Sequence, residues 1–299
     1  MGLINVIQRV SVPAPAKINL FLAVIGKRTD GFHDLVSVMA KLDLADLVTI
    51  DRVDKKNHIS CACNGTDRLD GVKNLAEDAV QAWRTFTGIK DGLHLTIQKE
   101  IPIEAGLGGG SSDAVATLLG LNGMMKNPLS HQELIELSAK VGSDCPSFLI
   151  PGLCVVQGRG ERVRAVSPPL DKEMQGKSVM LFKPPLGFST ADIFGAFGRR
   201  KKFSEAEKVQ EKLSNWESQK LSTDQFLSND LESPIWEKHL YIPSLFRCIE
   251  EEFGLFPRLS GSGSCCFCIG TENTPWLKVK KVIRLAWGDE AFVEQVQII

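Results

Sequence analysis

The chain has 299 residues, of which 43% are hydrophobic and 24% are charged, and its formal net charge at pH 7 is −1. These values are those of an ordinary globular protein, so they exclude the disordered and fibrous classes. A near-neutral chain also lacks the basic face that nucleic acid or an anionic membrane usually requires, and we expect neither as a partner. The length favours two domains of ordinary size.

No segment reaches the roughly 20 apolar residues that span a bilayer, and the N-terminus lacks the pattern of a secretory signal. The chain contains eight cysteines, namely Cys61, Cys63, Cys145, Cys154, Cys248, Cys265, Cys266 and Cys268. In the absence of an export signal we expect them to be reduced and mostly buried, as small hydrophobic residues. Neither CAC nor CCFC has the C-x-x-C spacing of zinc sites, so no metal–thiolate site is predicted. The expected location is cytoplasmic.

Strands are predicted in the N-terminal half where apolar residues alternate. The clearest covers residues 18–25, and its alternation points Lys17 and Asn19 to the same face. Shorter strands are predicted over residues 47–50, 58–63 and 93–99.

Three helices are predicted between and after these strands, and two of them carry the capping-box spacing at their starts. The first covers residues 75–86, with Asn74 as its N-cap, Glu77 three residues later and Gly88 at its end. The second begins at the cluster Ser111, Ser112, Asp113 and runs to about Met125. The third begins at Ser130, with Glu133 three residues later, and stops at Gly142.

The C-terminal part begins after a stretch of prolines and charges, residues 167–177, which is the predicted boundary between domains 1–167 and 168–299. Residues 198–220 are predicted to be a charged, mostly helical, solvated segment. In the last third, helices are predicted over residues 245–253 and 276–286, and strands over residues 265–269 and 292–298. A glycine loop is predicted over residues 260–264. Strands and helices mix without a regular alternation, which favours the α+β class.

The stretch IPIEAGLGGGSSDAVATLL, residues 101–119, places a glycine-rich loop directly before a helix. Main-chain N–H groups of such a loop converge on one point, where the helix dipole adds attraction for an anion such as phosphate. A structural turn whose serines only cap the helix is the alternative. The Walker pattern G-x-x-x-x-G-K-S/T, the dinucleotide pattern G-x-G-x-x-G and the nucleophile elbow G-x-S-x-G are all missing, which leaves a phosphate loop of another kind or a plain turn.

Two further stretches carry a family resemblance, PAPAKINLFL at residues 13–22 and RLSGSGSCCFCI at residues 258–269. Together with AGLGGGSSDA they resemble, in order and spacing, the three signature motifs of the GHMP kinase superfamily. Within it, PAKINLFL, GKRTDGFHDL, AGLGGGSSDA and VGSDCPSFL followed by GRGE are most similar to the members that phosphorylate the 2-hydroxyl of 4-diphosphocytidyl-2-C-methyl-D-erythritol, in the non-mevalonate (MEP) pathway of isoprenoid synthesis. The resemblance covers roughly residues 11–270. Ser264 departs from it, because many relatives carry proline there.

The resemblance implies a two-domain α+β kinase, with a ribosomal protein S5 domain 2-like N-terminal domain and a ferredoxin-like α/β-plait C-terminal domain. It implies ATP as the phosphate donor and Mg²⁺, which such transfers require. It also implies that Lys17 and Asp144 are catalytic, since an ammonium keeps a neighbouring carboxylate ionised and the carboxylate can accept the hydroxyl proton. The alternatives are a solvated surface lysine and an aspartate that caps a turn.

The resemblance assigns the remaining site residues as well. The ATP-binding loop would consist of Pro102, Ile103, Glu104, Ala105, Gly106, Leu107, Gly108, Gly109, Gly110, Ser111 and Ser112. The substrate-binding residues would be Asn19, Phe32 and His33, with Phe194 as a further aromatic beside the cytosine. A histidine satisfied by the backbone is the alternative for His33.

Other residues have weaker assignments. Asn74 would lie near the adenine, although its N-cap role explains it equally well. Glu104 and the serines would help to position Mg²⁺, whose ligands the sequence does not identify. Gly261, Ser262 and Gly263 would shape the site, and a plain turn is the alternative. The rival functions are another kinase of the superfamily, such as a homoserine or mevalonate kinase, and a non-catalytic nucleotide-binding protein.

Overall fold

The structure is a computed structural model, which describes residues 8–65, 74–126, 128–200 and 202–299. It divides into two compact units. Unit 1 contains the described residues of Met1–Ala16, Leu44–Ile101 and Gly108–Leu149, and unit 2 contains those of Lys17–Asp43, Pro102–Leu107 and Ile150–Ile299. Each unit is therefore assembled from three chain segments, whereas the division into residues 1–167 and 168–299 remains a prediction. Helices and two sheets make up the described chain, which confirms the α+β class.

Two long strands pass through both units, β1 (Arg9–Lys27) and β2 (His33–Val53). Both are much longer than the strands predicted over residues 18–25 and 47–50. The part of β2 that was not predicted is buried on both faces, since Val36 to Ala40 are all buried and no alternation marks it. The part of β1 that was not predicted, Arg9 to Lys17, contains Pro13 and Pro15, and proline in a sequence argues against a strand.

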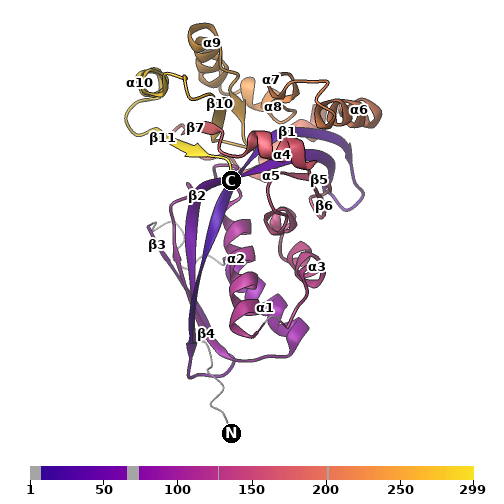
Figure 1. Ribbon diagram of the computed structural model, residues 1–299, viewed down its shortest axis with the longest axis vertical. Coiled ribbons are helices and arrows are strands. Elements are labelled where there is room, and N and C mark those ends of the chain that lie inside the picture. The colour runs from indigo at the N-terminus through magenta and orange to yellow at the C-terminus, as the bar shows by residue number, and fades with distance from the viewer. Residues whose placement is uncertain (1–7, 66–73, 127, 201) are drawn as a thin grey trace. The chain divides into compact units, whose positions relative to one another are not determined.

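Unit 1 is a sheet with helices on one side (Figure 1). The second half of β2 pairs antiparallel with β4 (Gly92–Gln98), which pairs parallel with β3 (Ile59–Asn64). The helices are α1 (Leu75–Thr87), α2 (Gly109–Met124) and α3 (His131–Val141), and the short 3₁₀ helix η2 (Cys145–Leu149) follows. The predicted capping boxes at Asn74 and Ser130 are confirmed, and so is the left-handed Gly88 that ends α1.

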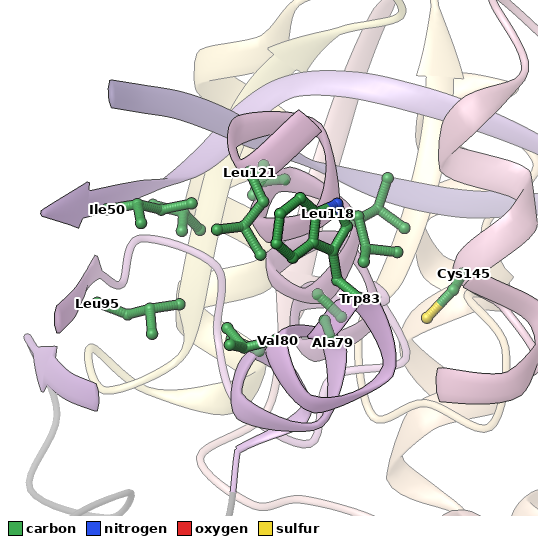
Figure 2. Packing of buried hydrophobic residues seen from close by; sticks show 14 of the residues in the cluster. Ile50, Ala79, Val80, Trp83, Leu95, Leu118, Leu121 and Cys145 are labelled. Atoms are coloured by element: carbon green, nitrogen blue, oxygen red, sulfur yellow. The ribbon is translucent and has the colours of Figure 1, made fainter. Parts of the chain in front are cut away.

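The core of unit 1 lies between these helices and the sheet (Figure 2). Trp83 of α1 is 1% exposed and packs with Leu118 and Leu121 of α2 and with Ile50 of β2. Burying each such side chain stabilises the fold by roughly 1.5–3 kcal/mol. A Cβ at Gly120 would lie 2.8 Å from the Ile50 side chain, so glycine lets α2 lie close to the sheet.

Unit 2 contains the first half of β2, paired antiparallel with β5 (Cys154–Gly158), which pairs with β6 (Arg162–Ala165). Within the same unit β1 pairs parallel with the two-residue strand β8 (Ser228–Asn229). A second sheet has the order β11 (Phe292–Gln297), β7 (Ser178–Lys183), β10 (Cys266–Gly270), β9 (Arg258–Leu259), and all its pairs are antiparallel.

The helices of unit 2 are α4 (Pro168–Met174), α5 (Thr190–Arg200), α6 (Ala206–Glu217), α7 (Thr223–Phe226), α8 (Glu232–Trp236), α9 (Tyr241–Phe253) and α10 (Trp276–Trp287). Phe182 of β7, Ile249 of α9 and Ile283 of α10 belong to one buried cluster, so these helices cover the second sheet. The predicted elements of the last third are confirmed, although α9 begins earlier, at Tyr241. The stretch 167–177, predicted as an irregular boundary, contains α4. Among the helices described, none combines the length and apolarity needed to cross a bilayer.

Candidate active site

The first motif forms a buried polar chain in unit 2. Lys17 Nζ donates a hydrogen bond of 2.6 Å to Asn19 Oδ1, and Asn19 Nδ2 donates one of 2.8 Å to Ser37 Oγ. The Lys17 and Asn19 side chains point the same way, as the alternation predicts, but they are only 4% and 1% exposed. The alternative of a solvated surface lysine is therefore wrong, and the direction of the ammonium is fixed by its neighbours.

The first half of the glycine-rich loop, Pro102–Leu107, meets both other motifs in unit 2. The Lys17 N–H donates to the Leu107 carbonyl at 2.9 Å, and Ser260 Oγ donates to the Gly106 carbonyl at 3.0 Å. Gly106 has a φ of +73°, and a Cβ there would lie 2.1 Å from the Ser260 carbonyl oxygen. Three stretches far apart in the sequence are thus joined by hydrogen bonds within one unit.

Gly261 brings the third motif directly against the first. Its φ is +55°, and a Cβ at this position would lie 3.3 Å from Lys17 Nζ and 3.3 Å from Asn19 Oδ1. Any side chain here would press on the ammonium and on its hydrogen-bond acceptor. Glycine therefore lets the 260–264 loop cover Lys17 closely.

The second half of the glycine-rich loop belongs to unit 1 and begins α2. Gly108, with a φ of 72°, is the N-cap, and the helix starts at Gly109, two positions before the predicted start at Ser111. No side chain caps this end, so the alternative in which Ser111 and Ser112 only cap the helix is wrong. The Ser112 hydroxyl is buried and has no hydrogen-bond partner in the described chain. An uncapped first turn beside a free hydroxyl has the donors that an anion needs.

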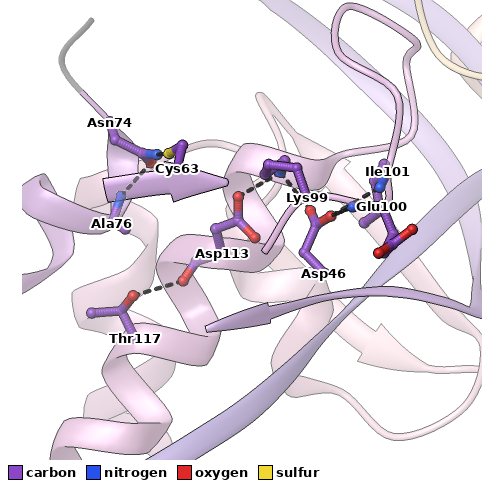
Figure 3. A network of polar contacts seen from close by, with 9 residues as sticks. All are labelled: Asp46, Cys63, Asn74, Ala76, Lys99, Glu100, Ile101, Asp113 and Thr117. Carbon is purple, nitrogen blue, oxygen red and sulfur yellow. Dashed lines mark hydrogen bonds and ion pairs between the residues drawn. The ribbon is translucent and has the colours of Figure 1, made fainter. Parts of the chain in front are cut away.

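A charged network lies beneath this turn, also within unit 1 (Figure 3). Lys99 Nζ donates to Asp113 Oδ2 at 2.7 Å and also pairs with Asp46 Oδ2. The second oxygen of Asp46 accepts from the main-chain N–H groups of Glu100 and Ile101, at 2.6 and 2.9 Å. A Cβ at Gly109 would lie 3.3 Å from Lys99 Nζ, so the network supports the loop from below.

The Asp46 and Asp113 carboxylates share one ammonium, that of Lys99. Burial raises the pKa of Asp113 to about 7; Lys99 opposes this rise and Asp46 adds to it. Burial also lowers the pKa of Lys99, but the two carboxylates outweigh it and the net shift is upward. No pattern in the sequence marks Lys99 and Asp46 as site residues, because the three groups come from separate parts of the chain and only Asp113 lies in a motif.

Asp144 lies in unit 1, between the end of α3 and η2. Its main-chain carbonyl accepts from the Ser147 N–H at 3.2 Å and from Ser147 Oγ at 2.6 Å. The main chain of Asp144 thus closes this turn. Asp144 and Lys17 belong to different units, and their catalytic pairing remains a prediction.

The predicted substrate residues gather in unit 2. The His33 ring lies 5.4 Å from that of Phe194, centroid to centroid, and Phe32 is 49% exposed with the Arg159 guanidinium 5.5 Å from its ring centroid. His33 Nε2 is buried and has no hydrogen-bond partner among the described residues, so it is not satisfied by the backbone. Burial, aided by Lys27, lowers the pKa of His33, which keeps the ring neutral near pH 7. An exposed aromatic ring and an unsatisfied imidazole nitrogen each suit contact with a flat, hydrogen-bonding base.

Asn74 and Glu104 are the residues with the weaker predicted roles. The Asn74 side chain accepts from the Ala76 N–H at 3.0 Å and donates to Cys63 Sγ, so its N-cap role is real (Figure 3). Glu104 is exposed and has a φ of +53°.

All eight cysteines are free thiols, and burial raises the pKa of Cys265 and Cys268 to about 12. Among the residues described, no group of three or more His, Cys, Asp or Glu side chains could hold a metal ion.

Known proteins resemble this chain over most of its length. Residues 74–152 match the family model for the GHMP kinases N terminal domain. A protein of Carboxydothermus hydrogenoformans is 40% identical over 266 residues, which cover 87% of this chain and 88% of that protein. One of Thermodesulfovibrio yellowstonii is 35% identical over 277 residues, covering 91% and 93%. Both are named 4-diphosphocytidyl-2-C-methyl-D-erythritol kinase.

Solved structures agree. A crystal structure of 4-(cytidine 5'-diphospho)-2C-methyl-D-erythritol kinase is 27% identical, with a TM-score of 0.71 over 96% of this chain and 99% of that one. Homoserine kinase from Cytophaga hutchinsonii reaches a TM-score of 0.75 over 100% and 97% of the two chains, but at 15% identity it shows the fold alone.

Proposed function

The chain belongs to the 4-diphosphocytidyl-2-C-methyl-D-erythritol kinase family, and on that premise we propose that it transfers the terminal phosphate of ATP to the 2-hydroxyl of 4-diphosphocytidyl-2-C-methyl-D-erythritol. This phosphorylation is a step of the MEP pathway to isoprenoid precursors. One observation supports the proposal above the others. Parts of all three motifs of the superfamily come together in unit 2, next to the buried Lys17.

The residues divide into three roles. The first turn of α2 and the loop Pro102–Ser112 would hold the ATP phosphates with main-chain N–H groups. Lys17 would stabilise the charge that develops on the transferred group, and Asp144 would accept the proton of the attacking hydroxyl. The hydroxyl would attack phosphorus directly, without a phospho-enzyme, since orientation and charge stabilisation supply most of the catalysis in such transfers.

Phe32, His33 and Phe194 would bind the cytosine of the substrate. The exposed Phe32 ring offers a stacking surface, and the neutral His33 offers a ring nitrogen that lacks a partner. Burial of that nitrogen without a hydrogen bond is unfavourable, and a base that bonds to it would remove the penalty. Asn19 would orient both Lys17 and the substrate from the same face of β1.

Mg²⁺ is the cation that phosphoryl transfer from ATP commonly uses. It is usually held by one or two protein oxygens together with phosphate oxygens. Ser112 fits that donor set, because its hydroxyl is buried at the first turn of α2 and unpartnered in the described chain. The Ser112 hydroxyl, with Glu104 as a second candidate, would hold the ion, which neutralises phosphate charge when bound.

The same proposal includes a cytoplasmic location. It is supported by the eight cysteines, which are free thiols, because reducing compartments keep cysteines in that state.

Product analysis tests the reaction. After incubation with ATP, mass spectrometry should show that the cytidyl substrate has gained one phosphate, and phosphorus NMR should show a phosphomonoester beside an intact diphosphate. A cleaved diphosphate, or a substrate that stays unmodified, would contradict the proposal.

A further inference from the structure

A five-residue segment outside the three motifs ties two of them together. It is Ser228–Glu232, with the sequence SNDLE, and we call it the SNDLE segment. It starts in the strand β8, whose residues pair with Phe21 and Leu22 of β1, the strand that carries Lys17 and Asn19. All of these residues belong to unit 2.

Asn229 makes the closest connection to the third motif. Its side-chain Nδ2 donates to the carbonyl of Gly261 at 2.7 Å and to that of Leu259 at 2.9 Å. Its Oδ1 accepts from the Leu231 N–H at 2.9 Å, which fixes which way the amide faces. The side chain is 5% exposed, so these three bonds satisfy it in a place that water hardly reaches.

Two acidic residues of the same segment, Glu232 and Asp230, bind the third motif and β1. Glu232 Oε1 accepts from the Leu259 N–H at 2.9 Å, on the strand that enters the 260–264 loop. Asp230 Oδ2 accepts from the Val24 N–H at 2.8 Å, on β1. The segment therefore holds the loop with two side chains and holds β1 with a third.

Gly261 connects the SNDLE segment to the side chain of Lys17. Its carbonyl is held by Asn229, while its Cα faces Lys17 Nζ and Asn19 Oδ1 so closely that even a Cβ would lie 3.3 Å from each. The position of the ammonium thus depends on where the loop sits. Misplacing a catalytic group by about 1 Å can lower a rate by roughly 100-fold.

We propose that Asn229 is a positioning residue for the phosphoryl transfer, which acts by holding the Gly261 carbonyl so that the 260–264 loop packs against Lys17. Glu232 supports it through the Leu259 N–H. This inference rests on the proposed function, because it assumes that Lys17 takes part in the transfer. Asn229 is not among the residues to which the proposed function assigns contact with ATP or with the cytidyl substrate.

The first test replaces the donor and keeps the acceptor. Asn229→Asp retains an oxygen for the Leu231 N–H but points a second oxygen at two carbonyls, which repels the loop. We expect kcat to fall by about 10- to 100-fold, while the dissociation constant of ADP, measured by calorimetry, stays within about twofold because the first turn of α2, which starts at Gly109, lies in unit 1. The matched control is Ile283→Val, which removes one buried methylene from α10 of the same unit and should lower the melting temperature without changing kcat.

A second pair of variants, at Glu232, tests the inference even if Asn229→Asp fails to fold. Glu232→Gln keeps an oxygen for the Leu259 N–H, and burial already raises the pKa of Glu232 to about 7, so a neutral side chain suits the site. Glu232→Leu has a similar volume but leaves that N–H without a partner. Glu232→Gln should retain kcat within about twofold, and Glu232→Leu should lose about 10-fold, the equivalent of one hydrogen bond of this kind.

Hydrogen exchange provides a readout that does not need turnover. In Asn229→Asp, peptides covering residues 258–265 should exchange faster than in the wild type, whereas in Ile283→Val they should not. The inference is overturned if Asn229→Asp has wild-type kcat and exchange, if the control loses as much kcat, or if Glu232→Leu equals Glu232→Gln. A wild-type enzyme that releases no ADP with the cytidyl substrate would instead overturn the proposed function, and the exchange data would still decide whether Asn229 holds the loop.

Discussion

The Lys17 ammonium and the Asn19 side-chain oxygen are joined by a hydrogen bond of 2.6 Å in a buried part of unit 2. A hydrogen bond to a charged group contributes about 1.5–3 kcal/mol, so its loss should impair whatever Lys17 does. We expect Asn19→Leu, which has a similar volume, to lower kcat at least about 10-fold, since 1.4 kcal/mol corresponds to tenfold. Steady-state kinetics check this. A variant with kcat within twofold of the wild type would show that Asn19 does not orient the ammonium.

Asp144 should be needed for turnover and not for nucleotide binding. Asp144→Asn removes a proton acceptor while keeping the shape of the side chain, and general-base groups contribute about 10²- to 10⁴-fold. We expect kcat to fall by that amount and the dissociation constant of ADP to stay nearly unchanged. Glu136→Gln, which removes the same charge from the exposed side of α3, is the control. Near-normal turnover in Asp144→Asn would remove Asp144 from the mechanism.

His33 should act on one substrate and not on the other. His33→Ala should raise the KM for the cytidyl substrate by about 10-fold or more, the effect of one buried hydrogen bond, and leave the KM for ATP within about twofold. His131→Ala, at the exposed start of α3, should change neither. Because burial lowers the pKa of His33, the ring is neutral near pH 7, and the KM for the cytidyl substrate should rise only on acidification below the usual titration range of histidine. Equal changes in both KM values would argue against contact with the base.

The ion-pair network of unit 1 predicts a stability effect. Lys99→Met leaves Asp46 and Asp113 buried without their shared cation, and breaking a buried pair in this way costs about 3–5 kcal/mol. Urea unfolding should show that loss in the free energy of unfolding. Glu100→Gln, next in sequence but outside the ion pairs that Lys99 makes, should change it by less than about 0.5 kcal/mol. A loss below 1 kcal/mol in Lys99→Met would mean that the carboxylates find other partners or take up protons.

Local signals in the sequence predicted some elements well. Asn74 with Glu77 and Ser130 with Glu133 define helix starts because the capping box is satisfied entirely by residues within one turn. The start of α2 was placed too late, since glycine is a less frequent N-cap than the serines that follow it. β2 was predicted too short because burial on both faces removes the alternation that marks a strand. β1 was predicted too short because Pro13 and Pro15 in its first part argue against a strand.

The candidate site was predictable only where a motif carries it. Lys17, Asn19 and the two glycine loops stand in recognisable stretches, and the structure joins them. Lys99 directly follows β4, Asp46 lies inside β2, and Asn229 lies in a strand of two residues, so no periodic pattern marks them. Their roles arise from tertiary contacts, which a single sequence does not display.

The most direct measurement of the central claim is ADP release by the purified chain with ATP and one acceptor at a time. The acceptors are 4-diphosphocytidyl-2-C-methyl-D-erythritol, homoserine and mevalonate. We predict rapid ADP release with the cytidyl substrate and only background release with the other two or with none. Rapid release with homoserine or mevalonate, or background release with all three, would contradict the account.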